Sequence, residues 1–278
     1  MIRRHELSDA EWEFVRPLLP ESLRGRKRLD DRTVLNGIVW KFRTGTAWRD
    51  VPERYGSWAT LPTRFRRWAK DGTFERMLRA AQAKADAPGD IEWLVSVDST
   101  IVRPGPPARG RSAKRGLRTP GLGRSRGGLT SKIHLACDAV GRPLAFTVTG
   151  GNTNDCTQFT AVMQAIRVPR LGPGRPRVRP DHVIGDKGYS SKPIRTWLRR
   201  RNIRHTIPER SDQIRNRLRR GSRDGRPPAF DNQVYKRRNV VEQCFNRLKQ
   251  WRGIATRYDK TAESYQAAVT LAALLMWA

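Results

Sequence analysis

The hydrophobic period of this chain changes at Ala87-Pro88-Gly89, and that change limits the fold more than any other feature. Before it, apolar residues recur at the three- and four-residue spacing of helices. After it, they alternate or form short runs rich in β-branched residues, which is the pattern of strands. We therefore predict a small all-helical domain over residues 1–88, followed by an α/β domain with a mixed sheet over residues 89–278.

The predicted helical domain has features of a DNA-binding module. Ser8 and Glu11 stand at capping-box spacing, which predicts a helix from Asp9 to Pro20. Similar patterns predict helices over residues 31–44, from about residue 60, and on to about residue 86. The helix that begins near residue 60 is basic on its outer face, which carries Arg64, Arg66, Arg67 and Lys70. This arrangement is typical of a helix-turn-helix-like DNA reader, and also of a plain bundle with a solvated basic face.

The second domain is predicted to mix strands and helices. Strands are expected over residues 94–102, 129–138, 143–149, 183–185 and 203–207, and helices over 158–166 and 193–201. Gly141 provides a turn that joins the second and third strands as a hairpin. Residues 269–277 are apolar but too few to span a membrane, so they are expected to form a docking helix.

Three segments of this domain are dense in Arg, Pro and Gly, namely 104–128, 167–180 and 215–228. None of them carries enough apolar surface to order itself. We expect these segments to be basic loops that become ordered when they bind DNA. For any single segment, a solvated linker is an equally good explanation.

The charge of the chain indicates a polyanionic partner. Lys and Arg number 56 against 26 acidic residues, which gives a formal net charge of +30. Such a charge attracts nucleic acid through its phosphates and makes binding steeply salt-dependent. The three cysteines are an odd number without metal-ligand spacing, and the N-terminus has no apolar run. We therefore expect reduced thiols in a cytoplasmic protein, with no secretory signal and no membrane partner.

Two aspartates occupy positions where a carboxylate is costly unless something compensates its charge. Asp98 lies inside the apolar strand Leu94–Val102, so we expect a bound metal or a paired charge beside it. Asp186 follows the apolar segment Val183-Ile184-Gly185 and can project from the carboxyl edge of a strand into a crevice. Taken singly, each is also explained as an ordinary surface or turn aspartate.

Glu242 belongs to a polar stripe with its neighbours. Tyr235, Arg238, Glu242 and Lys249 are spaced 3, 4 and 7 residues apart, so on a continuous helix they fall within an arc of roughly 60°. The adjacent arc of the helix is apolar, with Val241, Cys244, Phe245 and Leu248. We expect this face to pack on a sheet, so that the polar stripe faces the edge of the sheet. A surface helix with an Arg238–Glu242 ion pair at i,i+4 has the same pattern.

The three carboxylates have the chemistry of a metal site. Mg²⁺ is a hard ion that takes oxygen ligands, and carboxylates at a strand–helix crevice can hold it together with a substrate phosphate. Two such ions, with Mn²⁺ as an expected substitute, would activate the attacking water and stabilise the leaving oxygen at phosphorus. Without metal, close carboxylates repel one another and their pKa values rise. We predict that Asp98, Asp186 and Glu242 are both the metal ligands and the catalytic residues.

At these positions the chain resembles a known family. Tyr235-x2-Arg238-x3-Glu242-x6-Lys249 matches in full the signature of bacterial insertion-sequence transposases of the four/five supergroup. Val97-Asp98-Ser99-Thr100 and Gly185-Asp186-Lys187-Gly188-Tyr189 resemble its first and second acidic blocks. The similarity continues in the segments 7–12, 46–52 and 257–260. The chain is identified as a member of the insertion sequence five family of transposases.

The resemblance implies a ribonuclease-H-like catalytic fold, an Asp-Asp-Glu triad, Mg²⁺ dependence and binding to the terminal inverted repeats of a mobile element. It also implies that Tyr235, Arg238 and Lys249 contact transposon-end DNA. Bringing two ends to target DNA implies a homodimer or a larger assembly, in a bacterial, nucleoid-associated protein. Because 55 residues separate Asp186 from Glu242, no large β-rich insertion is expected between them.

Two other functions fit the same residues. A DNA-binding regulator, or a relic with a broken triad, would bind DNA without cutting it. A stand-alone ribonuclease-H-like nuclease would cut without preferring inverted repeats. Among the other acidic residues, Asp155 is expected to cap a helix or to support the site indirectly, and Asp138 to stabilise a hairpin turn. His134 is expected to be structural.

Overall fold

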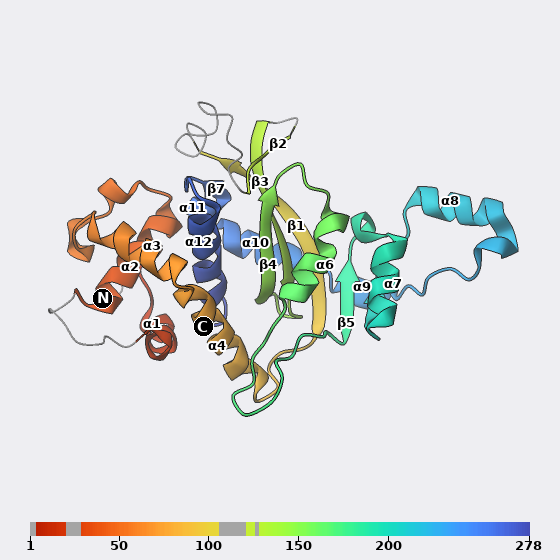
Figure 1. The fold of residues 1–278 in the computed structure, drawn as a ribbon, viewed down its shortest axis with the longest axis horizontal. Helices are drawn as coiled ribbons and strands as arrows, with labels where there is room; N and C mark the ends of the chain where they lie inside the picture. The colour runs from red at the N-terminus through yellow and green to blue at the C-terminus, as the bar shows by residue number, and fades with distance from the viewer. Residues whose placement is uncertain (1–3, 21–28, 106–120, 126–127) are drawn as a thin grey trace.

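The computed structural model describes residues 4–20, 29–105, 121–125 and 128–278 (Figure 1). The N-terminal part is helical, as predicted, with α1 (Asp9–Val15), α2 (Asp31–Thr44), α3 (Thr60–Lys70) and α4 (Thr73–Asp86). Short 3-10 turns lie at Arg16–Leu18, Trp48–Asp50 and Glu53–Tyr55. The predicted capping box forms, because the Glu11 N–H donates to Ser8 Oγ at 3.0 Å and the Ser8 N–H donates to Glu11 Oε2 at 2.7 Å. Gly45, at φ 74°, ends α2.

The second part is built on a mixed sheet. Its strands are β1 (Leu94–Pro104), β2 (Gly123–Ser125), β3 (Gly128–Cys137), β4 (Pro143–Gly150), β5 (His182–Gly185), β6 (Arg204–Thr206) and β7 (Thr256–Arg257). The main layer has the order β4-β3-β1-β5-β6. β4, β3 and β1 are antiparallel neighbours, whereas β5 and β6 continue from β1 in parallel. This is the ribonuclease-H-like arrangement, so the predicted fold class is confirmed.

Helices cover this sheet and extend beyond it. They are α6 (Asp155–Ala165), α7 (Lys192–Arg200), α8 (Ser211–Arg220), α9 (Asn232–Lys236), α10 (Asn239–Lys249), α11 (Arg252–Ala255) and α12 (Ala262–Leu274), with 3-10 turns at Lys187–Tyr189 and Gly221–Asp224. α6 packs against β3 and β4, and α10 packs against β1 and β3. Figure 1 shows α8 as an arm at the end of the molecule opposite the N-terminal helices.

The structure differs from the sequence prediction in one of the three expected basic loops. The expected loop 215–228 is partly helical, because Ser211–Arg220 contains no Gly or Pro and Arg217 pairs with Glu209 at 2.9 Å. The expected loop 104–128 lies mostly outside the described residues, and its described part holds β2. The expected loop 167–180 is irregular apart from a bridge between Val168 and Arg177.

The prediction of a single helix around Glu242 is also wrong, because a turn at residues 237–238 separates α9 from α10. At the break, the N–H groups of Arg238 and Val241 donate to carbonyls three residues back, those of Tyr235 and Arg238, at 2.9 and 3.1 Å. Such bonds tighten the turn relative to an α-helix. Tyr235 therefore lies on α9, whereas Glu242 and Lys249 lie on α10, and the four signature residues do not form one helical stripe.

The N-terminal helices and the sheet share a hydrophobic cluster. α12 packs against both α4 and β4, as expected of a docking helix. Gln82 of α4 donates to the carbonyls of Pro143 and Leu144 at 3.1 and 3.0 Å, and Trp277 Nε1 donates to the same Pro143 carbonyl at 3.1 Å. Within the described residues, no helix is long and apolar enough to cross a membrane. The boundary between two domains near residue 88 stays a prediction.

Candidate active site

Asp98 lies in the middle of β1, with its side chain only 22% exposed. Its Oδ1 accepts the Ser99 N–H at 2.8 Å, and its Oδ2 accepts from Arg238 Nη1 at 2.8 Å. Burial raises the pKa of Asp98, the Ser99 N–H and the Arg238 charge oppose that rise, and the Asp186 charge adds to it. The partner that compensates this buried carboxylate in the structure is therefore Arg238.

Asp186 lies next to Asp98, directly after the end of the neighbouring strand β5. β1 and β5 are parallel and Val97 pairs with Gly185, so Asp98 and Asp186 are the next residues of two adjacent strands. The Gly188 N–H donates to Asp186 Oδ1 at 2.8 Å. A Cβ atom at Gly188 would lie 2.8 Å from the same oxygen, so the carboxylate occupies the space that only glycine leaves. This is a physical reason for the Asp-x-Gly spacing of the second acidic block.

Glu242 comes to the site from the first turn of α10. The apolar face of that helix, with Val241, Cys244, Phe245 and Leu248 buried, seats it on the sheet as predicted. Arg238 Nη2 donates to Glu242 Oε1 while its Nη1 holds Asp98, so one guanidinium joins the two carboxylates. The Glu242 side chain is 51% exposed, against 19% for Arg238.

The carboxylate oxygens of Asp98, Asp186 and Glu242 are the ligand type that a hard divalent ion prefers. In this structure, however, the three carboxylates are not close enough together to bind one ion. Among the described residues, no three acidic, histidine or cysteine side chains lie close enough to hold one ion together. A cation does occupy the position between Asp98 and Glu242, because the Arg238 guanidinium stands there. A metal that used both carboxylates would have to displace Arg238 from at least one of them.

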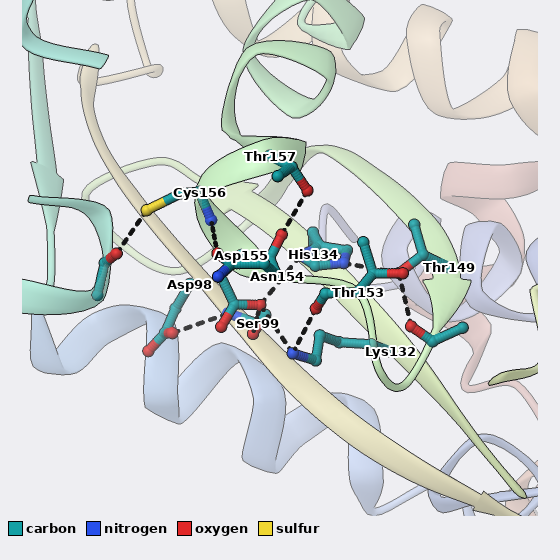
Figure 2. A network of polar contacts seen from close by, with 12 residues as sticks. Asp98, Ser99, Lys132, His134, Thr149, Thr153, Asn154, Asp155, Cys156 and Thr157 are labelled. Carbon is teal, nitrogen blue, oxygen red and sulfur yellow. Dashed lines mark hydrogen bonds and ion pairs between the residues drawn. The ribbon is translucent and has the colours of Figure 1, made fainter. Parts of the chain in front are cut away.

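A second polar network lies directly beside Asp98 (Figure 2). Asp155 Oδ1 accepts from Ser99 Oγ at 2.7 Å and from Lys132 Nζ at 3.0 Å, and His134 Nδ1 lies 3.5 Å from it. Asn154, rather than Asp155, caps α6, since its Oδ1 accepts the Cys156 N–H at 2.9 Å. The capping role predicted as one option for Asp155 is wrong, and its contacts are those of a supporting group.

Sequence reasoning missed the part that Lys132 takes in this network. Lys132 is only 9% exposed, and its Nζ also donates to the Thr153 carbonyl at 2.9 Å. A lysine next to the apolar end of β3, where Ile133, Leu135 and Ala136 follow it, was a signal that could have identified it. His134 is buried and its Nε2 lies 2.8 Å from Thr149 Oγ1, in keeping with a structural role.

The remaining predicted residues lie around this centre or away from it. Tyr235 stacks near Phe230 with ring centroids 5.2 Å apart, and Lys249 is half-buried on α10, where burial lowers its pKa. Asp138 is fully buried in the β3–β4 turn and pairs with Arg142 at 2.7 Å, as expected of a turn residue.

The basic face predicted on α3 needs one correction. Arg66, Arg67 and Lys70 are exposed. Arg64 is not on the outer face, because it pairs with Asp31 at 2.9 Å with only 11% of its side chain exposed, and it stacks over Trp68. The helical spacing placed Arg64 beside the exposed residues, and the pairing with α2 could not be seen from that spacing.

The chain matches two family models. Residues 7–78 match a model described as a putative transposase of the IS4/5 family, and residues 90–277 match the transposase DDE domain. The chain belongs to the DDE transposase family. The predicted family is thereby confirmed, and with it the enzyme class: DDE transposases cut and join DNA by phosphoryl transfer and use divalent metals.

Two relatives named as putative transposases agree with this assignment. The chain is 30% identical over 149 residues to a putative transposase for insertion sequence element IS6501 from Brucella ovis, covering 54% of this chain and 98% of the relative. It is 35% identical over 146 residues to a putative transposase for IS402 from Burkholderia cepacia, covering 52% of this chain and 62% of the relative. Among solved structures, it is similar to a piggyBac transposase synaptic complex with hairpin DNA, with a TM-score of 0.43, 12% identity, and coverage of 95% of this chain and 68% of that chain.

Proposed function

We propose that this transposase binds the terminal inverted repeats of its insertion sequence and catalyses cleavage and strand transfer with Asp98, Asp186 and Glu242 as its metal-binding triad. One observation carries the proposal. Asp98 and Asp186 follow paired residues of two adjacent parallel strands, and Arg238 joins Asp98 to Glu242 on the helix that covers them. Asp98 therefore neighbours Asp186 through the strand pairing and Glu242 through Arg238, and the proposal is that metal binding draws the three carboxylates together.

The triad would hold Mg²⁺, or Mn²⁺ in its place, through carboxylate oxygens. When bound, two such ions supply a nucleophile at neutral pH and stabilise the charge on the leaving oxygen. The chain prepares this site by fixing its ligands. The Ser99 and Gly188 N–H groups orient the Asp98 and Asp186 carboxylates, and Asp155 holds the Ser99 hydroxyl from behind.

Under this proposal Arg238 pairs first with the carboxylates of the triad and later with a DNA phosphate. In the structure it forms ion pairs with both Asp98 and Glu242. If Asp98 and Glu242 held a metal instead, the Arg238 guanidinium would be free to pair with a DNA phosphate, which is its natural bidentate partner. Tyr235 on α9 and Lys249 on α10 would contact the same DNA end from the flanking turns.

Binding of the DNA ends would draw on the basic surface of the whole chain. The net charge of +30 gives affinity through phosphate contacts, without sequence information. Arg66, Arg67 and Lys70, exposed on α3, are the residues we assign to the end sequence. Two ends and a target must meet, so the active form would be a homodimer or a larger assembly on DNA.

The test removes one charge from the triad. Glu242→Gln keeps the size of the side chain but removes the charge that a hard metal requires, so cleavage and strand transfer on an end-containing duplex should fall by orders of magnitude. DNA binding and thermal stability should stay close to those of the wild type. Glu92→Gln is the matched control, because Glu92 pairs with Arg237 at 2.6 Å in an exposed position away from the triad.

The outcomes separate the competing functions. A non-catalytic regulator would bind the duplex, and neither the wild type nor the variants would cut it. Wild-type cleavage by Glu242→Gln in Mg²⁺ would remove Glu242 from the triad and end the mechanism proposed for it.

A further inference from the structure

The surface beside the first residues of α3 carries a tryptophan that the fold leaves in contact with water. All nine tryptophans lie within the described residues, and only Trp58, in the turn before α3, is exposed, at 51%. A single exposed apolar side chain is common and needs no explanation by itself. Trp58 differs from such residues in the side chains around it, none of which belongs to the triad.

Trp58 borders a hollow of about 570 Å³ together with Arg49, Arg66 of α3, and Lys260, which follows β7. The three basic residues are exposed. Within the described parts of the chain, none of them forms an ion pair with an acidic side chain, and no acidic residue lines the hollow. The hollow is therefore a positively charged surface, which fits a polyanion better than a protein face of mixed charge.

One of these basic side chains also orients the tryptophan ring. The Arg49 guanidinium lies over the Trp58 ring, 5.0 Å from its centroid. This cation–π contact restricts the ring before any ligand arrives, so less ordering entropy is lost on binding. With Arg49 in place, half of the Trp58 surface still remains exposed. The ring can therefore accept a second planar group against the surface that the guanidinium leaves free.

An aromatic ring among basic side chains selects a ligand that has both negative charge and flat rings. Single-stranded nucleic acid has both, because its phosphates pair with Arg and Lys while its bases stack on aromatic side chains. Paired DNA fits less well. A wedge between stacked base pairs needs both faces of the inserted side chain, and Arg49 already covers one face of Trp58. An unpaired base needs only the other face.

We propose that Trp58 is a stacking platform for a base of an unpaired DNA strand, and that Arg66 and Lys260 bind the phosphates beside that base. Arg66 also belongs to the basic face of α3, where Arg67 and Lys70 are exposed further along the helix. A strand on the platform would thus lie next to DNA bound along α3. The inference rests on the proposed DNA binding and adds to it a contact with unpaired DNA that does not involve the triad.

The test compares two single strands that carry the same charge, a short oligothymidylate and an abasic strand of equal length. Because the phosphate contacts are the same, the difference in Kd reports the contribution of the bases. The full-length wild-type protein should bind the oligothymidylate roughly tenfold more tightly. Trp58→Leu should lose most of that preference, while its affinity for the abasic strand stays at the wild-type value.

Two further variants separate stacking from charge. Val140→Ala shortens another exposed apolar side chain, 59% exposed in the turn between β3 and β4, and should keep the wild-type preference. Arg66→Gln combined with Lys260→Gln should weaken the binding of both strands alike. It should also reduce the slope of log K against log salt by about 1.4, the value for two phosphate contacts with a single strand. In the wild type, an irradiated strand that contains 5-iodouracil should crosslink to Trp58.

Each contrary result has a separate meaning. Equal affinity of the wild type for the two strands, or an unchanged preference in Trp58→Leu, overturns the platform and leaves the proposed function standing. Weaker binding of an end-containing duplex by Trp58→Leu, with no base preference among single strands, would assign Trp58 to paired DNA and also overturn the platform. An end-containing duplex that binds no better than a scrambled one overturns the proposed end recognition, and the single-strand comparison still decides the platform.

Discussion

Replacing Arg238 with glutamine tests whether this residue occupies the position of a metal ion. The variant loses a charge-assisted hydrogen bond to the largely buried Asp98, and such bonds contribute about 1.5–3 kcal/mol. Its contact with the half-exposed Glu242 adds at most about 0.5 kcal/mol. Without metal, the free energy of unfolding should fall by about 2 kcal/mol, which for a chain of this size corresponds to a Tm lower by about 5 °C.

The same substitution should make divalent ions bind more tightly. In the wild type a metal must displace the guanidinium from Asp98 or Glu242, and in Arg238→Gln that competition is gone. Thermal unfolding with and without Ca²⁺, together with calorimetric titration of Ca²⁺, measures both effects without any turnover. Arg237→Gln is the matched control, since Arg237 pairs with the exposed Glu92 and its loss should cost at most about 0.5 kcal/mol.

Equal stability of Arg238→Gln and Arg237→Gln in a chelator would show that the bridge to Asp98 contributes nothing. Weaker Ca²⁺ binding by Arg238→Gln would show that the arginine helps to assemble the metal site, and would refute the idea that the guanidinium and the ion compete for the same carboxylates.

Two further predictions concern neighbouring residues. Gly188→Ala should retain the wild-type Tm but lose most cleavage, because the new methyl group displaces the Asp186 carboxylate, and undiminished cleavage would contradict this. Burial lowers the pKa of His134 to about 4, so the folded state keeps the ring neutral and the wild type loses stability as the pH falls below 6.5. By pH 5 this loss should reach about 2 kcal/mol in urea unfolding, and His134→Gln should lack it. Parallel pH dependences of the two proteins would refute the assignment.

Much of the fold followed from local patterns in the sequence. The capping box at Ser8, the helical spacing over residues 31–44 and the strand patterns of β3 and β4 each act over a few residues, and each formed where it was expected. The positions of Asp98 inside a strand and of Asp186 directly after one were predictable for the same reason. A carboxylate within or directly after an apolar run is costly unless its charge is compensated, so it indicates a candidate site without knowledge of the partner strand.

The parts that could not be predicted depend on contacts between distant segments. Spacing placed Tyr235 and Glu242 on one helix, whereas the turn at Arg238 separates them and directs the guanidinium to Asp98, 140 residues away in the chain. Spacing also placed Arg64 on an exposed face, whereas Asp31 of another helix pairs with it. The pair of Lys41 and Asp259 gave no signal either, because each is an ordinary surface residue type and only the fold buries them together.

The packing of α12 against α4 has a consequence for the decay of mobile elements. A frameshift late in the gene would delete the last helix and leave the face of α4 that it covers in contact with water. The loss would then reach back into the helices at the start of the chain, although their own codons are intact. Damaged copies of such an element would leave no stable N-terminal fragment to compete for the DNA ends of intact ones.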